Sequence, residues 1–371
     1  MLFFKLSAFY FFYFAAVGVY IIFLPKVLQD IGYNSVDIGI VFALAPLMRF
    51  LTPFLFLKHI KLNKTIFKYT LILAIISSSL FYLTINNFYA FMFNNAILGI
   101  CLSLVLPYIE IISLNNLGKN SYGKARLFGS IGFMLVGLIL AKFLTYSYVA
   151  LHYYLIATIL TAFFSYLLIK YDIEHQDNID DDEFSIIKYL PFWISIFLMQ
   201  VSFGGFYNFF TIYETAHNIS LETTSYLWAF GVICEIAMLY FQAPLLKYNL
   251  IKIIKFSILI TAFRWLLLFL FPDSLTISFL SQSIHAISFG LYHSAVIIYL
   301  YSLYSNKKLA QQFMLGIAYG LGGFIGALIA GYAYGKYLFL YSALIAVLAF
   351  LFLISGKFKF FCYILSPQKR E

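Results

Sequence analysis

The chain has 371 residues, of which 63% are hydrophobic and 11% are charged, and its formal net charge is +9. Soluble domains carry about 25% charged residues, so this composition excludes a water-soluble globular protein, a disordered chain and a coiled coil. Three cysteines are too few for a disulfide scaffold or a paired CxxC metal site. The positive charge does not indicate nucleic-acid binding, because excess Lys and Arg in a membrane protein mainly reports topology.

A membrane-spanning helix needs about 20 mostly apolar residues, and the chain contains twelve such segments. We therefore predict an all-α membrane protein with twelve transmembrane helices. The predicted spans lie near 6–24, 36–57, 67–86, 88–113, 127–145 and 148–169, and then near 190–213, 223–246, 253–271, 275–303, 312–335 and 338–356.

The basic residues fix the predicted orientation of these spans. If the N-terminus is cytoplasmic, 18 of the 24 Lys and Arg residues lie on the inner side, three lie outside and three lie within spans. Such a bias places both termini in the cytoplasm.

An internal repeat divides the chain into two pseudo-symmetric six-helix halves. KYTLILAIISSSLFYL at 68–83 resembles KFSILITAFRWLLLFL at 255–270, and FGSIGF at 128–133 resembles YGLGGF at 319–324. The segment IEHQDNIDDDE lies between the halves and is acidic without an apolar face, which is typical of a flexible linker. We predict an N-terminal half at 1–171, a cytoplasmic linker at 172–188, a C-terminal half at 189–356 and a basic tail at 357–371.

Ionisable side chains inside the spans are the candidate functional residues, because a charge in the hydrocarbon region is costly unless it is paired or faces water. The three arginines nearly balance the two glutamates, which favours mutual pairing around a wet cavity. The set comprises Arg49, Glu110, Arg126, Glu235, Arg264, His285 and His293.

Several roles remain open for these residues. Glu110 and Glu235 are proton carriers or structural counter-ions, and Arg264 binds an anionic substrate or holds Glu235 and His285 in place. We expect a functional role for His285 and a structural role for His293.

The tenth predicted span carries a polar stripe. Ser281, His285, Ser288 and Tyr292 are spaced by four, three and four residues, so they fall on one face of an α-helix. We expect this face to line the cavity. The glycines of the eleventh and fifth spans predict close helix packing instead of a nucleotide loop; they are Gly316, Gly320, Gly322, Gly323 and Gly326, with Gly129, Gly132 and Gly137.

Six motifs in this order resemble the phenylpropionate-transporter branch of the major facilitator superfamily, which is similar to lactose permease and the oligosaccharide–proton symporters. The motifs are FYFFYFAAVGVYIIFLPKVLQDIG (9–32), DIGIVFALAPLMRFL (37–51), YGKARLFGSIGF (122–133), YLWAFGVICE (226–235), FRW (263–265) and LSQSIHAISFGLYH (280–293). The resemblance implies the major facilitator fold, with the substrate bound near the membrane midplane between the halves.

The resemblance also implies roles for the intramembrane residues. It assigns Glu110 and Arg126 to substrate binding, and Glu235, Arg264 and His285 to binding and proton coupling. Ser288 stands where lactose permease has its proton-carrying glutamate, so the coupling acid must lie elsewhere. We expect Tyr292 to contribute to substrate binding, Glu110 to remain a second candidate for coupling, and Arg49 and His293 to belong to the charge network.

We therefore expect a secondary active transporter of the bacterial inner membrane, a proton symporter for an aromatic or other small carboxylate. A sugar or nucleoside symporter is the alternative within transporters, and a membrane-embedded enzyme or a sensor is the alternative outside them. The expected partners are a small solute, protons and the lipid bilayer, without nucleic acid, metal or cofactor. The expected functional unit is a monomer.

Overall fold

The computed structural model describes residues 1–58, 63–144, 146, 148–172 and 185–355, and within these ranges all regular structure is helical. Twelve of its helical segments are long and apolar enough to cross a membrane. The prediction of an all-α protein with twelve spans is confirmed. Most of the predicted linker and all of the predicted tail lie outside the described residues, so the domain boundaries remain predictions.

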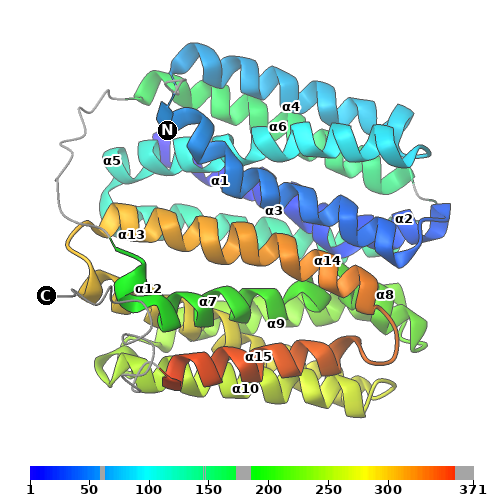
Figure 1. The fold of residues 1–371 in the computed structure, drawn as a ribbon. Helices are drawn as coiled ribbons and strands as arrows, with labels where there is room; N and C mark the ends of the chain where they lie inside the picture. Colours follow the sequence, from blue (N-terminus) through cyan, green and yellow to red (C-terminus); the bar gives the residue numbers. More distant parts are fainter. Residues whose placement is uncertain (59–62, 145, 147, 173–184, 356–371) are drawn as a thin grey trace, which may run out of the picture.

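The spans are built from α-helices with short 3-10 and π segments, labelled as in Figure 1. The elements are α1 (Leu2–Gly18), η1 (Val19–Phe23), α2 (Leu24–Ile31), α3 (Ser35–Lys58), α4 (Lys64–Thr84), α5 (Phe88–Phe143), α6 (Tyr148–Leu168), η2 (Ile169–Tyr171), η3 (Ile187–Tyr189), α7 (Leu190–Ser202), α8 (Gly204–Ala216), α9 (Leu221–Phe241), η4 (Leu245–Lys247), α10 (Leu250–Leu270), α11 (Leu275–His285), η5 (Ala286–Leu291), α12 (Tyr292–Leu303), α13 (Lys307–Met314), η6 (Leu315–Gly322), α14 (Gly323–Ala333) and α15 (Leu338–Ser355).

Breaks inside these helices separate or bend the spans. Helix α5 carries both the fourth and the fifth span, which are divided at Gly118, where φ is 69°. Glycine occupies this position because a side chain is strained in the left-handed region. The seventh span continues to Ala216, past the end predicted at residue 213.

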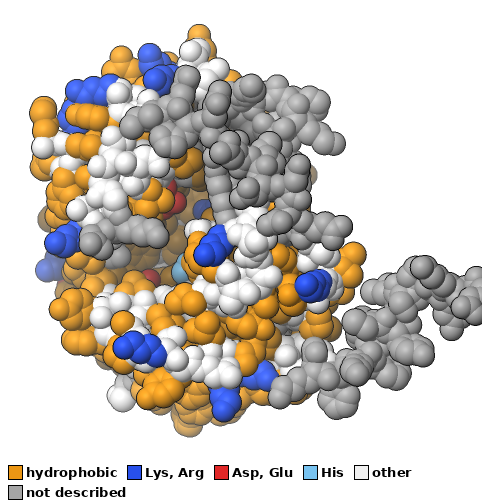
Figure 2. All heavy atoms as spheres, turned by 90° about the vertical axis from the view of Figure 1, so that its left-hand side faces the viewer, with side chains coloured by type: hydrophobic (Ala, Val, Ile, Leu, Met, Phe, Trp, Pro, Cys, Tyr) orange, Lys and Arg blue, Asp and Glu red, His pale blue; other side chains and the backbone are white. Residues whose placement is uncertain are grey.

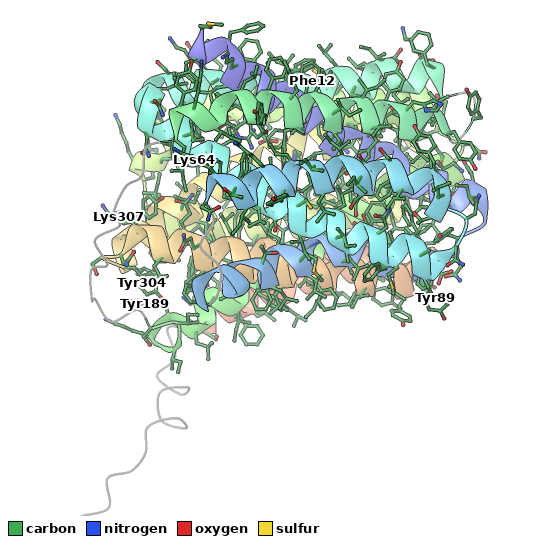
Figure 3. The ribbon with its side chains drawn as sticks, turned by 90° about the horizontal axis from the view of Figure 1, so that it is seen from above. Phe12, Lys64, Tyr89, Tyr189, Tyr304 and Lys307 are labelled. Atoms are coloured by element: carbon green, nitrogen blue, oxygen red, sulfur yellow. The ribbon has the colours of Figure 1, made fainter. Side chains whose placement is uncertain are left out.

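The two ends of the helix bundle form opposite faces of the molecule. Figure 3 places Lys64, Tyr189 and Lys307 at one end and Tyr89 at the other. We call the first end, which also carries the N-terminus, the terminal face, and the second the distal face. Figure 1 shows the first six spans in the upper part of the view and the last six in the lower part, with α3 beside α14 at their boundary.

The two groups of spans come into backbone contact near the distal face. A Cβ atom on Gly39 of α3 would lie 2.8 Å from the carbonyl oxygen of Ala327 and 2.8 Å from Cα of Gly331 in α14. Real Cβ atoms do not approach that closely, so glycine is what lets α3 and α14 touch here.

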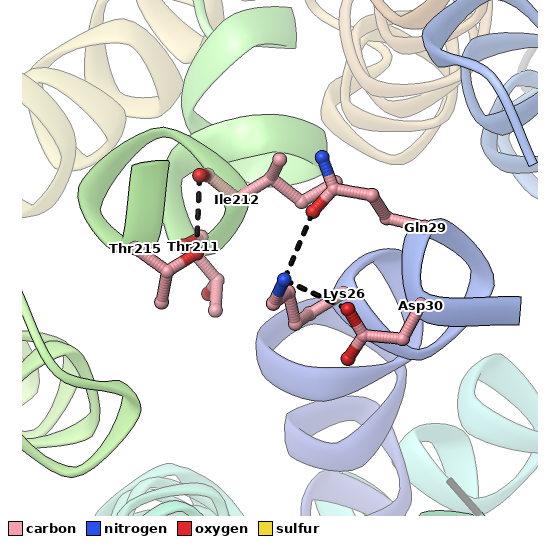
Figure 4. Close-up of polar contacts among 6 residues, drawn as sticks. All are labelled: Lys26, Gln29, Asp30, Thr211, Ile212 and Thr215. Atoms are coloured by element: carbon pink, nitrogen blue, oxygen red, sulfur yellow. Dashed lines mark hydrogen bonds and ion pairs between the residues drawn. The ribbon is translucent and has the colours of Figure 1, made fainter. Parts of the chain in front are cut away.

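A second distal contact joins α2 and α8. In Figure 4, Lys26, Gln29 and Asp30 of α2 lie opposite Thr211, Ile212 and Thr215 of α8. Lys26 Nζ is 2.8 Å from Asp30 Oδ1 and donates to Gln29 Oε1 at 3.1 Å. Both contacts close the boundary between the first six and the last six spans on the distal side.

Glycine packing also operates within each group of spans, as the sequence predicts. A Cβ atom on Gly132 would meet the carbonyl oxygen of Phe11 in the first group, and one on Gly326 would lie 2.8 Å from the carbonyl oxygen of Val201 in the second. Gly320 instead packs across the boundary, where a Cβ atom would lie 2.9 Å from Cβ of Phe50 in α3. At Gly316 the nearest atom is 3.7 Å away, an ordinary contact, so this glycine is not required for packing.

Candidate functional site

The first polar cluster lies in α5 and combines the two residues expected to meet. Arg126 Nε is 3.7 Å from Glu110 Oε1, and the Tyr122 hydroxyl donates to the same oxygen at 3.3 Å. The break at Gly118 turns the chain back, which brings a residue of the fourth span beside a residue of the fifth. The predicted pairing of Glu110 with Arg126 is therefore present.

This cluster is reached by water. The side chain of Arg126 is 33% exposed and that of Glu110 is 31% exposed. The guanidinium carbon of Arg126 lies 3.9 Å from the ring centroid of Phe14 and 5.5 Å from that of Tyr10. Phe14 can approach because position 129 is glycine, where a Cβ atom would lie 2.6 Å from its ring.

The second polar cluster surrounds Arg264 of α10, which has no exposed surface. Its guanidinium packs against two neighbouring aromatic rings, with centroid distances of 4.4 Å to Phe206 and 4.5 Å to Trp265. It donates to Ser281 Oγ at 3.2 Å, Ser288 Oγ at 3.2 Å and His285 Nδ1 at 3.0 Å. Arg264 is thus held by the protein itself.

The contact with Arg264 fixes the tautomer of His285. Arginine only donates hydrogen bonds, so Nδ1 of His285 must be the acceptor and the ring hydrogen must lie on Nε2. Nε2 faces Glu235 Oε2 of α9 at 3.6 Å. Arg264, His285 and Glu235 therefore form a chain in which each member orients the next, with Glu235 at its more exposed end.

The polar stripe of the tenth span is present, but it does not face open water. Ser281 and Ser288 are fully buried against Arg264 instead of lining a cavity. Tyr292 is also buried, and its hydroxyl makes no hydrogen bond to any described residue, so its part in substrate binding stays a prediction. The π-helix η5 at Ala286–Leu291 adds a residue to the turn before Tyr292, which changes its phase relative to His285.

The other residues of the predicted charge network, His293 and Arg49, form no ion pair within the described part of the chain. His293 Nδ1 is 2.6 Å from the hydroxyl of Tyr319, and Arg49 is exposed. That they belong to the charge network stays a prediction.

The terminal face gives access to the interior between the two groups of spans. Figure 2 shows this face hollowed, with acidic and histidine side chains visible in the hollow. The opposite side is closed by the α3–α14 and α2–α8 contacts. The structure is thus open to the terminal face and closed to the distal face.

Sequence analysis missed one buried acid. Glu214 of α8 is fully buried, and the Ser278 hydroxyl lies 3.1 Å and 3.0 Å from its two carboxyl oxygens. The predicted seventh span ended at residue 213, so Glu214 was placed in the following connection. The apolar sequence before Glu214 stops without indicating that the helix continues. Span length is the signal that could have found it, because a tilted spanning helix of ordinary length extends as far as Glu214.

Comparison with solved structures finds transporters of the same architecture. The nucleoside transporter NupG has a TM-score of 0.75 and 16% sequence identity, and the alignment covers 96% of this chain and 100% of that chain. A bacterial homolog of the human lysosomal transporter Spinster, in an inward-facing and unoccupied conformation, has a TM-score of 0.71 and 13% identity, with coverage of 99% and 98%. The POT family transporter PepTSo has a TM-score of 0.71 and 10% identity, with the same coverages. At such low identities the likeness shows the fold alone.

Sequence comparison adds the family. No curated protein matches the chain. The family model described as "MFS_1 like family" matches residues 3–343, which is most of the chain. Twelve spans with an open terminal face and a closed distal face agree with this match. The chain is therefore a multi-pass membrane transporter that belongs to the MFS_1 like family.

Proposed function

We propose that this transporter moves a small organic carboxylate together with protons, and that Arg126 binds the carboxylate. The observation that carries the proposal is the contrast between its two paired arginines. Arg264 is fully buried and its donors are used within the protein. Arg126 is partly exposed, and within the described part of the chain its two terminal nitrogens donate no hydrogen bond. They offer the planar fork that recognises a carboxylate.

The charges of the central residues support an anionic substrate. Arg49, Arg126 and Arg264 outnumber Glu110 and Glu235 by one. A bound monoanion balances this excess, which matters because unpaired charge is costly inside a membrane.

The surroundings of Arg126 favour a carboxylate that carries an apolar group. The Phe14 and Tyr10 rings form a wall beside the guanidinium. Such a wall offers an aromatic ring apolar contact while the carboxylate meets Arg126. This supports the expectation of an aromatic carboxylate that the phenylpropionate-transporter resemblance implies.

Glu235 is the proposed coupling acid. Its carboxylate is more exposed than the His285 ring, so it exchanges protons with the hollow more easily. His285 directs its Nε2 hydrogen at Glu235 and thereby stabilises the ionised form. If His285 moves away from Glu235 when the transporter changes state, the ionised form of Glu235 loses this hydrogen bond. Glu235 then takes up a proton in one state and releases it in the other.

We also propose that the protein resides in the inner membrane of a bacterium with its terminal face in the cytoplasm. The excess of Lys and Arg in the connections on that face supports this orientation. With this orientation the hollow opens inward.

A sugar or nucleoside symporter is the second candidate. It is favoured by the position of Glu110 beside Arg126, because an exposed acceptor next to an exposed donor suits a hydroxylated solute. In such a transporter Arg126 donates to hydroxyl groups, and a negative charge on the solute is not needed.

Thermal shift on the purified protein separates these candidates. The probes are 3-phenylpropionate, its uncharged analogue 3-phenylpropionamide, uridine and lactose. We expect only the acid to stabilise the wild type, and we expect Arg126→Gln to remove that shift. Lys124→Gln is the matched control, because Lys124 is an exposed cation two residues away on the same helix. Equal shifts from acid and amide, or an unchanged shift in Arg126→Gln, contradict the proposal; a shift from uridine or lactose alone favours the second candidate.

A further inference from the structure

Glu214 is a buried acid that the function proposed above does not use. It lies at the distal end of α8, and neither its side chain nor that of Ser278 has exposed surface. In the described part of the chain no salt bridge reaches it, so it differs from Glu110 and Glu235, which each face a cationic or basic side chain.

The hydrogen bonding around Glu214 fits a neutral carboxyl group better than a charged one. Among the described residues, Ser278 is the only side chain that bonds to it, and its one hydroxyl hydrogen lies near both carboxyl oxygens. An ionised carboxylate has about four acceptor sites, so a single donor leaves most of them empty in an environment without water. A protonated carboxyl group needs fewer donors and can itself donate to the Ser278 oxygen.

The ionisable groups near Glu214 do not provide a counter-charge. Lys26 of α2 is already bound to Asp30 and Gln29. Tyr213 donates to the Leu268 carbonyl, and His217 bonds to the Tyr213 carbonyl. The other ionisable groups at this end of the bundle are Glu222 of α9, Asp273 before α11, Tyr334 at the end of α14 and the exposed Lys336 after it. Lys336 Nζ lies over the Tyr337 ring, 5.9 Å from its centroid. None of these four groups bonds to the Glu214 carboxyl in the described part of the chain.

The position of Glu214 connects it to closure of the distal face. Thr211, Ile212 and Thr215, which flank it on α8, are the residues that lie opposite α2 in Figure 4. The α2–α8 contact crosses the boundary between the first six and the last six spans. The Glu214 carboxyl itself bonds to Ser278 of α11 and lies beside this contact along α8. Separation of α2 from α8 therefore opens to distal water the part of α8 that carries Glu214.

We propose that Glu214 is a second proton-binding site, which holds a proton while the distal face is closed and exchanges it with distal water when that face opens. The inference rests on the proposed alternating-access transport, but it does not depend on which solute is carried. It makes distal closure depend on proton uptake, because an ionised Glu214 resists burial. The reaction is simple protonation: a hydronium ion in the distal water gives the proton and leaves as water, and the carboxylate oxygen forms the O–H bond, with Ser278 as its hydrogen-bond partner.

Infrared spectroscopy of the purified protein tests the protonation directly. A neutral carboxyl group has a carbonyl stretching band that an ionised one lacks. We expect the wild type at neutral pH to show this band, Glu214→Gln to lose it, and Ser278→Ala to keep it at a shifted frequency. Glu222→Gln, which alters an exposed acid near the same face, is the matched control and should leave the band unchanged.

Two results overturn the inference. One is a wild-type spectrum whose carboxyl band is the same in Glu214→Gln. The other is a band that disappears when sodium replaces choline in the buffer, because it assigns the site to a metal cation. Neither measurement uses a transported solute. The inference about Glu214 can therefore fail while carboxylate binding at Arg126 is confirmed, and carboxylate binding can fail while the inference is confirmed.

Electron-spin distance measurements test the link to the distal face. Spin labels at Asn86→Cys and Lys336→Cys, both exposed at distal connections, report its opening in a protein whose native cysteines are replaced. We expect the distance to increase with pH in the wild type and to stay short in Glu214→Gln, which is permanently neutral. An increase with pH in Glu214→Gln equal to that of the wild type contradicts the link.

Discussion

Arg264 and Arg126 have the same charge but different surroundings, and this decides what each does. Arg264 is enclosed by Phe206 and Trp265 and has polar partners for its donors, whereas Arg126 is one-third exposed beside an equally exposed Glu110. The sequence predicts that both arginines lie in spans. It does not predict which of them is enclosed, because enclosure depends on residues from other helices.

Substitution should therefore affect stability very differently at the two sites. Arg264→Gln leaves His285, Ser281 and Ser288 without their donor, and each buried polar group left unsatisfied costs about 1–3 kcal/mol. Arg126→Gln breaks only an exposed pair, worth about 1 kcal/mol or less. Thermal unfolding in detergent measures both changes. Equal destabilisation by the two variants contradicts the assignment of Arg264 to the protein interior.

The His285 tautomer is a second prediction at this scale. Since Nδ1 accepts from Arg264, we expect nitrogen-15 NMR of histidine-labelled protein to show an unprotonated Nδ1 and a protonated Nε2 for this residue. The signal is assigned by its absence in His285→Asn. A hydrogen on Nδ1 is incompatible with the Arg264 contact and contradicts the proposed chain to Glu235.

Helix contacts at the distal face depend on glycine, which makes them sensitive to one added methyl group. Gly39→Ala places a Cβ atom 2.8 Å from backbone atoms of α14 and should push α3 and α14 apart. Because these helices join the two groups of spans, we expect the distal face to open. Over-packing of this kind costs about 1–3 kcal/mol.

Accessibility of a distal cysteine introduced at Lys336 measures that opening. Gly123→Ala is the matched control, since nothing lies within 4 Å of a Cβ atom at that position. Labelling that is no faster in Gly39→Ala than in Gly123→Ala contradicts a closing role for the α3–α14 contact.

At the level of whole helices, most of the architecture follows from apolar run length alone, since twelve runs give twelve spans. The exceptions have local physical causes. The π-helix in the tenth span moves Tyr292 out of the phase predicted from α-helical spacing. Glu214 was missed because hydropathy marks where apolar sequence stops, whereas the helix continues into buried polar residues. Neither feature has a periodic signal in the sequence.

The orientation of the whole molecule follows from its basic residues. We expect reporter fusions at Ser305 and Asn218 to report opposite sides of the membrane, with Ser305 in the cytoplasm. These positions lie in connections at the two ends of the bundle. The same readout from both positions contradicts the twelve-span arrangement, and exchanged readouts contradict a cytoplasmic terminal face.

The molecule as a whole is closed at the distal face and open at the terminal face, with Arg126 and Glu235 in separate groups of spans. This division allows the solute and the coupling proton to be handled by parts that move relative to each other. The halves were predicted from a weak internal repeat. The sequence does not predict which face is open, because the same sequence adopts every conformation of the transport cycle and the open face differs between them.

Uptake of labelled 3-phenylpropionate into proteoliposomes, driven by an inside-alkaline pH gradient, tests the proposed transport most directly. We predict that the wild type accumulates the acid above its equilibrium level and that Arg126→Gln neither accumulates nor exchanges it. Glu235→Gln should lose accumulation but still exchange labelled for unlabelled acid, because exchange requires no net proton release. Accumulation by Arg126→Gln at the wild-type rate, or uphill accumulation by Glu235→Gln, would contradict the account.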